Sequence, residues 1–459
     1  MAGMALNSLY SLVDAFWLGK MRVGAREALA AVGPTAALSF IVVAFGTGFG
    51  SGGTALVAQH TGAKRPRQAD EAAGQTLLLL PLVTTVMASL MFIFASQVLS
   101  LLQTPTEVKP KALAFLRIIL IGMPFIAFNI GYGSALRALG DTLTMVMIGV
   151  CTNLLNFVLS PLLIFGLGPV PAMGIRGAAT VGAFAEVMTA VTCVVLLRRG
   201  RSGLRLTRAD FRPNKQIIRQ IFRIGLPAGV SMCSNSLGFL ALQAMISSLG
   251  TTVMGAYTVG SRIIEICGIP SWALAMSTAP VVGQALGAGK PELARRAVRT
   301  SVMLFAFGML APYALIMAEG HLVARAFIND ARVIAEAGRF FLIVPASNYF
   351  FNVLTVLMSA FYGSGHTRPV MAISLLRQWG LRIPIALLLG FRASWKSLGI
   401  YFGLAWGSIG IYLGLAGGNV IAAALAWWVF SMGAWERAVV PSRAETSDAA
   451  STTPETTRT

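Results

Sequence analysis

Charged residues are scarce in this chain of 459 residues, and their scarcity excludes a soluble fold. Asp, Glu, Lys and Arg make up 12% of the sequence, against roughly 25% in an ordinary soluble domain. Hydrophobic residues make up 56%, and the mean hydropathy is +0.73. Because too few polar side chains remain to cover a water-facing surface, the composition predicts a polytopic membrane protein.

Residues that build catalytic and metal centres are also scarce. Three histidines (His60, His321 and His366) are scattered near predicted loops, and four cysteines lie in or beside apolar runs without metal-ligand spacing. A loop at 284–291 resembles a phosphate-binding loop but lacks its first Gly and its Ser/Thr, which argues against ATP-driven transport. We therefore predict no metal, no cofactor and no enzyme; an intramembrane enzyme would need a convergent acid, base or metal cluster.

Acidic residues are outnumbered, 17 against 36 Lys and Arg, for a formal net charge of +19. The basic residues lie mostly in short connections between apolar runs, which is a topology signal rather than a nucleic-acid surface. The connection from Arg198 to Arg223 holds nine of them against a single acid, Asp210. We expect this connection and both termini to be cytoplasmic, in a multi-pass protein of the inner membrane.

Twelve apolar runs are long enough to cross a bilayer, for which a helix needs about 20 residues. In lipid, backbone polar groups must be satisfied within their own segment, so all twelve are predicted to be helices. The first six spans are predicted at 4–19, 28–57, 74–101, 112–137, 143–166 and 174–197. The other six are predicted at 221–249, 253–285, 300–318, 335–361, 370–391 and 398–432.

The two halves repeat at an offset of 225 residues. The recurring pairs are Gln59 and Gln284, Gly62 and Gly287, Pro66 and Pro291, Ser134 and Ser359, Gly140 and Gly365, and Thr142 and Thr367. Six spans in each half keep the two bundles parallel, which is typical of carriers whose lobes rock around a central site. We predict an amino-terminal lobe at 1–197, a basic connecting loop at 198–223, a carboxy-terminal lobe at 224–432 and a disordered tail at 433–459.

Seven segments recur in the order of a known family: Asp14 in the first span, Leu29–Gly33, Val57–Ala63, Ala135–Thr142, Gly225–Gly229, Ala256–Gly260 and Val282–Gly289. Together they resemble the multidrug and toxic compound extrusion (MATE) family, most closely its amino-lobe-coupled (DinF-like) branch. The resemblance implies a monomeric antiporter that exports amphipathic, cationic organic compounds in exchange for H⁺, with Na⁺ as the alternative ion. The chain departs from the family pattern at its start, since only thirteen residues precede Asp14. We expect a truncated first span.

The alternative within the same superfamily is a flippase of lipid-linked oligosaccharides. Such a protein should carry more basic residues within its spans. Arg117, Arg137, Arg377 and Arg382 keep this alternative open, although they lie toward the ends of their spans.

Asp14 is the sharpest candidate for ion coupling. Asn7, Ser11 and Asp14 follow the i, i+4, i+7 spacing of one helical face. A carboxylate inside a membrane span costs about 3 kcal/mol and generally faces a cavity or a partner. Because burial disfavours its charged form, we expect proton uptake there. The alternative is a position near the membrane end, beside Lys20.

The fifth span supplies further polar candidates. Asn153, Asn156 and Ser160 lie in it, and Thr180 of the sixth span completes the predicted set. The segment from Asn156 to Pro161 resembles a family motif, Asn-x-x-x-Asp-Pro, in which Ser160 here replaces the acid. One carboxylate instead of two weakens Na⁺ coordination, so we favour H⁺.

Two further acids are candidates for secondary protonation, Glu186 in the sixth span and Glu265 in the eighth. Glu265 follows Arg262 by three residues, so a structural ion pair is the favoured interpretation there. In another branch of the family a Glu occupies the position of Asn235, which makes an ion site in the carboxy-terminal lobe doubtful.

Overall fold

The computed structural model describes residues 16–17, 20, 25–101, 104–166, 171–200, 203–390, 393–395, 400–402 and 406–440. Contacts divide the chain into two compact units, Met1–Cys233 and Ser234–Thr459. The division falls inside one long helix, α7 (Lys215–Ser247), whose first half belongs to the first unit. The lobe boundaries expected at 197 and 224 stay a prediction.

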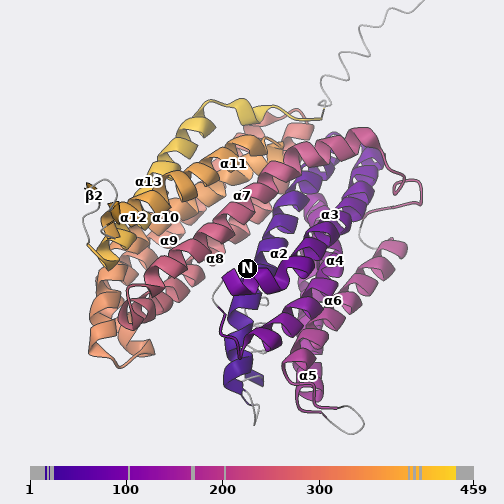
Figure 1. Cartoon of the computed structure of the whole chain (residues 1–459). Helices are drawn as coiled ribbons and strands as arrows, with labels where there is room; N and C mark the ends of the chain where they lie inside the picture. Colours follow the sequence, from indigo (N-terminus) through magenta and orange to yellow (C-terminus); the bar gives the residue numbers. More distant parts are fainter. Residues whose placement is uncertain are drawn as a thin grey trace, which may run out of the picture. The chain divides into compact units, whose positions relative to one another are not determined.

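Five further helices build the described part of the first unit (Figure 1): α2 (Ala25–Gly62), α3 (Pro66–Leu101), α4 (Lys109–Leu139), α5 (Leu143–Phe165) and α6 (Ile175–Arg198). Helix α4 lies at the centre, where it packs against α2, α3 and α6, while α5 packs on α6. A core of buried Leu, Val, Phe, Met and Ala side chains fills the space between these helices.

The second unit repeats this arrangement with two additions. Its elements are α8 (Thr251–Gly287), α9 (Pro291–Phe327), α10 (Ala331–Ser364), α11 (Thr367–Leu375), a π-helix η1 (Leu376–Arg382), α12 (Ile383–Gly390), β1 (Ala393–Trp395), β2 (Ile400–Phe402), α13 (Ser408–Ser431) and a short 3₁₀ turn η2 (Ala434–Glu436). Helix α10 is central, packed against α8, α9 and α13. The two strands pair antiparallel, with Ala393 opposite Phe402.

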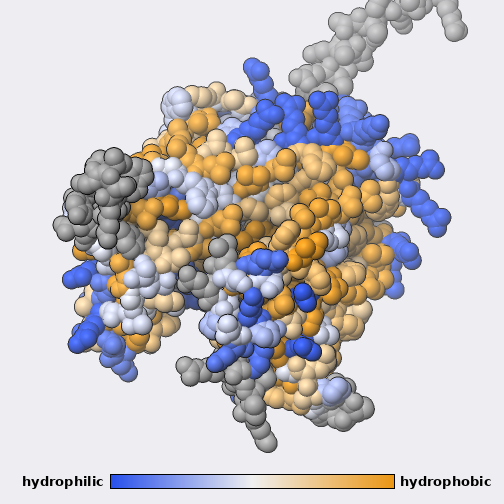
Figure 2. Space-filling view, viewed as in Figure 1, coloured by the Kyte–Doolittle hydropathy of each residue, from blue (hydrophilic) through white to orange (hydrophobic). Residues whose placement is uncertain are grey.

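Eleven helical segments among the described residues are long and apolar enough to cross a membrane, with α11, η1 and α12 forming one of them. Large apolar side chains are exposed along these helices, whereas hydrophilic residues gather near helix ends (Figure 2). A surface of this kind is stable against lipid and not in water. The prediction of an all-α multi-pass membrane protein is confirmed. Most of the first predicted span, 4–19, lies outside the described residues.

Two predicted spans were wrong at their ends. The last was expected from 398, but residues 400–402 form a strand and α13 begins only at Ser408, after Gly407 with φ 59°. The run Ile400-Tyr-Phe402 is apolar but β-branched and aromatic, which favours a strand. The ninth was expected at 300–318, yet α9 covers Pro291–Phe327. Its additional first turns carry exposed Arg295 and Arg296, whose stems pack while their charges reach water.

The predicted repeat has a structural counterpart. Helices α3 and α9 start 225 residues apart, at Pro66 and Pro291, and α4 and α10 end 225 residues apart, at Leu139 and Ser364. After the β-hairpin the offset grows to 233, which separates both ends of α6 from those of α13. Each residue of one unit therefore has a definite counterpart in the other.

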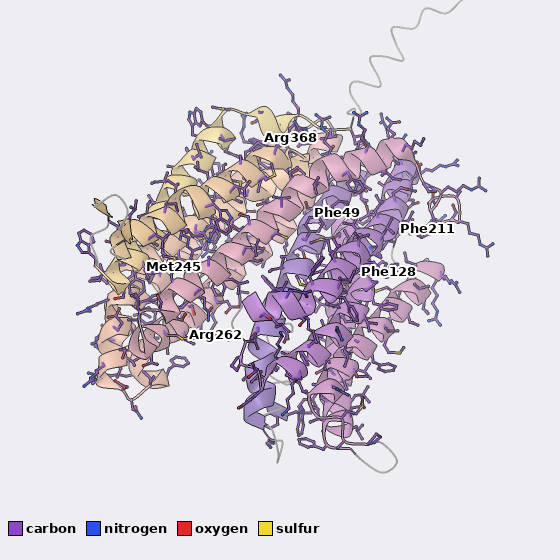
Figure 3. The ribbon with its side chains drawn as sticks, in the orientation of Figure 1. Phe49, Phe128, Phe211, Met245, Arg262 and Arg368 are labelled. Atoms are coloured by element: carbon purple, nitrogen blue, oxygen red, sulfur yellow. The ribbon has the colours of Figure 1, made fainter. Side chains whose placement is uncertain are left out.

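Close backbone contact joins α2 to the first half of α7. A Cβ added at Gly48 would lie 2.5 Å from the carbonyl oxygen of Ala228, and one at Gly225 would lie 2.6 Å from that of Phe49. The Phe49 ring (Figure 3) packs edge-on against Phe222, with centroids 5.1 Å apart. Only glycine permits an approach this close.

The connecting segment is bound to α3. The Gln75 side chain donates from Nε2 to the carbonyl oxygens of Asp210 and Arg212, at 2.8 and 2.7 Å. Asp210 in turn accepts from the backbone and hydroxyl of Thr207, both at 2.7 Å. The single acid of the basic connection therefore stabilises its turn.

Candidate functional site

The three residues predicted as one polar stripe of the first span, Asn7, Ser11 and Asp14, lie outside the described residues. Trp17 is described, and its ring lies 5.9 Å from that of Phe157 and 6.1 Å from that of Phe165, both on α5. Phe157 directly follows Asn156. Trp17 therefore packs on the helix that carries the second predicted set.

The polar face of α5 is buried and incompletely bonded. Asn156 and Ser160 are 1% and 0% exposed, and Ser160 Oγ lies 3.4 Å from Asn156 Oδ1. Asn153 donates from Nδ2 to the carbonyl oxygen of Gly149 at 2.8 Å. Within the described residues, Asn153 Oδ1 and Asn156 Nδ2 have no hydrogen-bond partner. A buried polar atom left unbonded costs about 1–3 kcal/mol, so this face is suited to binding a further polar group.

Glu186 lies at the centre of a second buried group in this unit. Its Oε2 accepts a hydrogen bond from Asn129 Nδ2 of α4 at 2.7 Å. Asn129, 7% exposed, lies with its Oδ1 3.9 Å from Cys193 Sγ. One turn from Glu186, the Thr189 hydroxyl lies 2.5 Å from that of Thr152, which joins α6 to α5. We call these five residues the Glu186 cluster.

The Glu186 cluster holds a carboxylate with neutral partners. None of the ion pairs formed by the described residues includes Glu186. A membrane-embedded acid without a cationic partner is typical of proton sites in transporters. Asn129 was missed from the sequence, although it is a lone amide in an otherwise apolar stretch of α4.

Two other predicted residues lie apart from the cluster. Thr180 donates to the carbonyl oxygen of Arg176 in its own helix at 2.8 Å. Glu265 pairs with Arg262 at 3.4 Å, as the i, i+3 spacing predicts, and both side chains are largely exposed.

The second unit carries a buried cation at the corresponding place. Adding 225 to Thr152 gives Arg377, and adding 233 to Glu186 gives Asn419. Arg377 is 4% exposed and donates to Asn419 Oδ1 at 3.0 Å and to Asn235 Oδ1 at 2.7 Å. Its guanidinium also lies 4.3 Å from the centre of the Phe351 ring. Asn235, where a related branch has Glu, is here an acceptor for arginine.

A separate polar network in the second unit joins α8, α9 and α10. Ser271 donates to Asn352 Oδ1 at 2.6 Å, and Asn352 donates from Nδ2 to the Tyr313 hydroxyl at 2.8 Å. Tyr313 in turn donates to Asn348 Oδ1 at 2.8 Å. Because these groups satisfy one another, the network is explained by helix packing.

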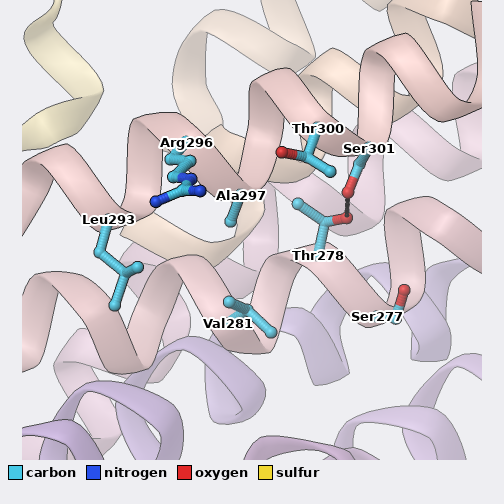
Figure 4. Close-up of a pocket in the computed structure, with 8 residues that line it drawn as sticks. All are labelled: Ser277, Thr278, Val281, Leu293, Arg296, Ala297, Thr300 and Ser301. Carbon is cyan, nitrogen blue, oxygen red and sulfur yellow. Dashed lines mark hydrogen bonds between the residues drawn. The ribbon is translucent and has the colours of Figure 1, made fainter.

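A surface groove of about 320 Å³ lies between α8 and α9 (Figure 4). Thr278 and Ser301 point toward each other there, with their hydroxyls 2.7 Å apart, and Arg296 lies beside them. The counterparts of Thr278 and Ser301 in the first unit are Gly53 and Thr76, which pack too tightly to admit a Cβ at Gly53. The groove holds no carboxylate, so it is a weaker candidate for ion coupling.

Comparison with known proteins agrees with the repeat. The MatE family profile matches one segment in each half, residues 1–162 and 227–388. The probable multidrug resistance protein YoeA of Bacillus subtilis is 26% identical over 392 residues, covering 84% of this chain and 83% of the relative. An FAD transporter of Shewanella oneidensis is 25% identical over 389 residues, covering 85% of each.

Solved structures share the fold. A MOP superfamily transporter from Pyrococcus furiosus, described as having a binding pocket of reverse polarity, aligns with a TM-score of 0.82 at 25% identity over 94% of this chain and 93% of that one. A MATE crystal structure in the bent conformation aligns with a TM-score of 0.82 at 24% identity, over 98% and 95%.

The duplicated membrane-spanning helices and the buried polar groups within them define a membrane transporter. This chain belongs to the MATE family of multidrug efflux transporters. Members of this family are transporters and not enzymes, as predicted. Membership of the amino-lobe-coupled branch stays a prediction.

Proposed function

We propose that this protein is a monomeric H⁺-coupled antiporter of the inner membrane, with both termini in the cytoplasm. It exports amphipathic, cationic organic compounds by alternating the accessibility of its two lobes. The observation that carries the proposal is a membrane carboxylate, Glu186, bonded to neutral Asn129 in a member of a drug-efflux family. The name of the relative YoeA supports multidrug transport.

Proton binding acts on the packing of α4 against α6. The 2.7 Å bond from Asn129 to the Glu186 carboxylate joins these helices, and it is strongest when the acid is ionised. Protonation weakens this bond and loosens the joint. We assign Asp14 the same part for the first span: protonation from outside favours release of the cargo, and deprotonation to the cytoplasm resets the transporter.

The donor set favours H⁺ over Na⁺. A Na⁺ site needs several hard oxygen ligands, and among the described residues no group of three His, Cys, Asp or Glu side chains could hold a metal ion. Ser160 on α5 supplies a hydroxyl where a second acid would strengthen Na⁺ binding. No cofactor is required.

The relatives also bear on the cargo. An FAD transporter among them raises anionic compounds as a second substrate class, and buried Arg377 supports it. The flippase alternative is not favoured, because the relatives are named for transport of drugs or FAD. Two of the arginines that kept it open have local partners: Arg117 lies 5.1 Å from the Phe92 ring, and Arg137 donates to Ser134 Oγ at 3.1 Å.

The test is dye efflux from proteoliposomes under separately imposed pH and Na⁺ gradients. We expect a pH gradient alone to drive export, and Asp14→Asn and Glu186→Gln each to reduce its rate by about tenfold or more. Glu265→Gln, an exposed acid paired with Arg262, is the matched control and should behave as wild type. Export driven only by Na⁺ would overturn the ion assignment. Export that neither variant reduces would exclude both acids as coupling residues.

A further inference from the structure

The second unit contains a positive charge that its described residues do not neutralise. The acceptors of Arg377, Asn235 and Asn419, are both neutral amides. No carboxylate in the described part of the chain forms an ion pair with Arg377 or Arg382. Basic residues within membrane helices are costly and generally mark a pathway or a binding site.

A π-helix brings the two arginines together. Arg377 and Arg382 are five residues apart in η1, where the backbone N–H of Ile383 bonds to the carbonyl oxygen of Gln378 in the i→i+5 pattern. This pattern sets residues i and i+5 about one turn apart, and Arg382 is close enough to repel Arg377. Such segments are less stable than α-helix and occur frequently at functional sites.

Two donors beside these arginines lack acceptors. Arg382 Nε and Gln378 Nε2 are buried, and neither has a hydrogen-bond partner within the described residues. Gln378 is 0% exposed, and its Oε1 accepts from Arg382 Nη1 at 3.3 Å. Arginine has only donors, so this group of three residues has more donors than acceptors. It therefore lacks an acceptor with several oxygens and a negative charge.

We propose that Arg377, Gln378 and Arg382 form an anion-binding subsite for the carboxylate or phosphate group of an amphipathic molecule. Arg382 makes the direct contact, because its side chain is only partly buried, whereas Arg377 is held in place by Asn235 and Asn419 and supplies positive potential. Exposed Leu376 and Trp379 on the same segment offer apolar surface for the rest of the molecule.

A purely structural role explains only part of this group. The bonds from Arg377 to Asn235 and Asn419 tie η1 to α7 and α13 and account for that arginine alone. They leave Arg382 Nε and Gln378 Nε2 unbonded. The subsite extends the proposed function, on which it rests for its cargo, from cations to compounds that also carry an acid.

The first experiment compares a rhodamine that carries a free carboxylate with its ethyl ester, since the pair differ only in the acid. Binding is measured by fluorescence polarisation to the full-length protein in a phosphate-free, uncharged detergent. We expect wild type to bind the acid about tenfold more tightly than the ester, as one charge-assisted hydrogen-bonded pair allows. Arg382→Gln should abolish this preference and leave ester affinity unchanged. Arg262→Gln, an exposed arginine on α8, is the control and should keep it.

Two results would overturn the subsite: equal affinity of wild type for acid and ester, or an Arg382→Gln variant that keeps the preference or weakens both ligands alike. Thermal unfolding checks that the variant is folded. If it is not, Arg382→Lys decides, because it keeps the charge and loses the planar fork. We then expect a reduced but measurable preference for the acid; an unchanged preference would contradict the proposal.

A second arm distinguishes a cargo acid from a lipid phosphate. The binding assay is repeated in nanodiscs of pure phosphatidylcholine and in nanodiscs that contain phosphatidylglycerol. A lipid phosphate in the subsite would compete, so phosphatidylglycerol would abolish the acid preference and would co-purify with wild type more than with Arg382→Gln. A cargo acid would retain its preference in both. Export of the ester under a pH gradient tests the proposed function separately, because it does not require the subsite.

Discussion

At matching positions of the repeat the two units carry different charges. In the first, Thr152 contacts Thr189 one turn from the acid Glu186; in the second, their counterparts include Arg377, which donates to Asn419 in the place of that acid. The pattern recurs at the start of the third helix of each unit, where Asp70 and Glu71 correspond to Arg295 and Arg296. One helical scaffold thus supports a carboxylate in one unit and a guanidinium in the other.

The scaffold can tolerate this change because apolar packing and punctuation by Gly and Pro define it, and neither depends on the charge. Pro66 and Pro291 begin equivalent helices whatever follows them. Charged residues cost too much in a membrane to be placed without a role, so their divergence indicates a division of function. We assign proton coupling to the first unit and recognition of anionic groups to the second.

The largest effect on stability should come from Arg377→Leu. Removing this guanidinium leaves Asn235 and Asn419 buried without their donor, which should cost about 3 kcal/mol of unfolding free energy. Thr152→Val at the matching position keeps the side-chain volume and should cost less than about 1.5 kcal/mol. Thermal unfolding in detergent measures both. Equal melting temperatures would remove the difference between the units.

Overpacking at the contact of α2 with α7 should rank second. Gly52→Ser places a side chain against Ile221 and Gly225 and should destabilise the protein by about 1–3 kcal/mol. Ser277→Gly, the reverse change at the matching residue of the second unit, removes an exposed hydroxyl and should have little effect on the melting temperature. A tolerated Gly52→Ser would contradict the close approach of these helices.

A smaller, local effect is expected at Gln75. Gln75→Leu leaves the carbonyl oxygens of Asp210 and Arg212 without their donor, at a cost of about 1 kcal/mol. Limited trypsin digestion should then cut faster after Arg205, Arg208 and Arg212. Thr300→Val at the matching position should leave this cleavage unchanged. Cleavage as slow as in wild type would show that Gln75 does not fasten the connection.

The smallest effect belongs to the surface pair of Arg295 with Glu436, whose closest atoms are 2.8 Å apart. Exposed ion pairs contribute little and are screened by salt. Arg295→Gln should lower the melting temperature slightly at low ionic strength and not at all in high salt. A decrease that persists in high salt would indicate a role beyond this pair.

Hydropathy predicted the position of nearly every described span, because a run of about 20 apolar residues has few alternatives. It was wrong where apolar residues form a strand, at 400–402. The partners within the two clusters could not be predicted. Asn129 and Glu186 are 57 residues apart, and Asn235 and Arg377 are 142 apart, so only packing brings them together. The repeat offset could have aligned Thr152 with Arg377, but the shift to 233 that pairs Glu186 with Asn419 depends on the hairpin.

The most direct test of this division of function uses both variants in one assay. Proteoliposomes with an imposed pH gradient export the rhodamine ester or the free acid, with wild type, Glu186→Gln or Arg382→Gln. We predict that Glu186→Gln loses export of both dyes, whereas Arg382→Gln loses only export of the acid. The same pattern for both variants, or loss of ester export in Arg382→Gln, would contradict the assignment of proton coupling to one unit and anion recognition to the other.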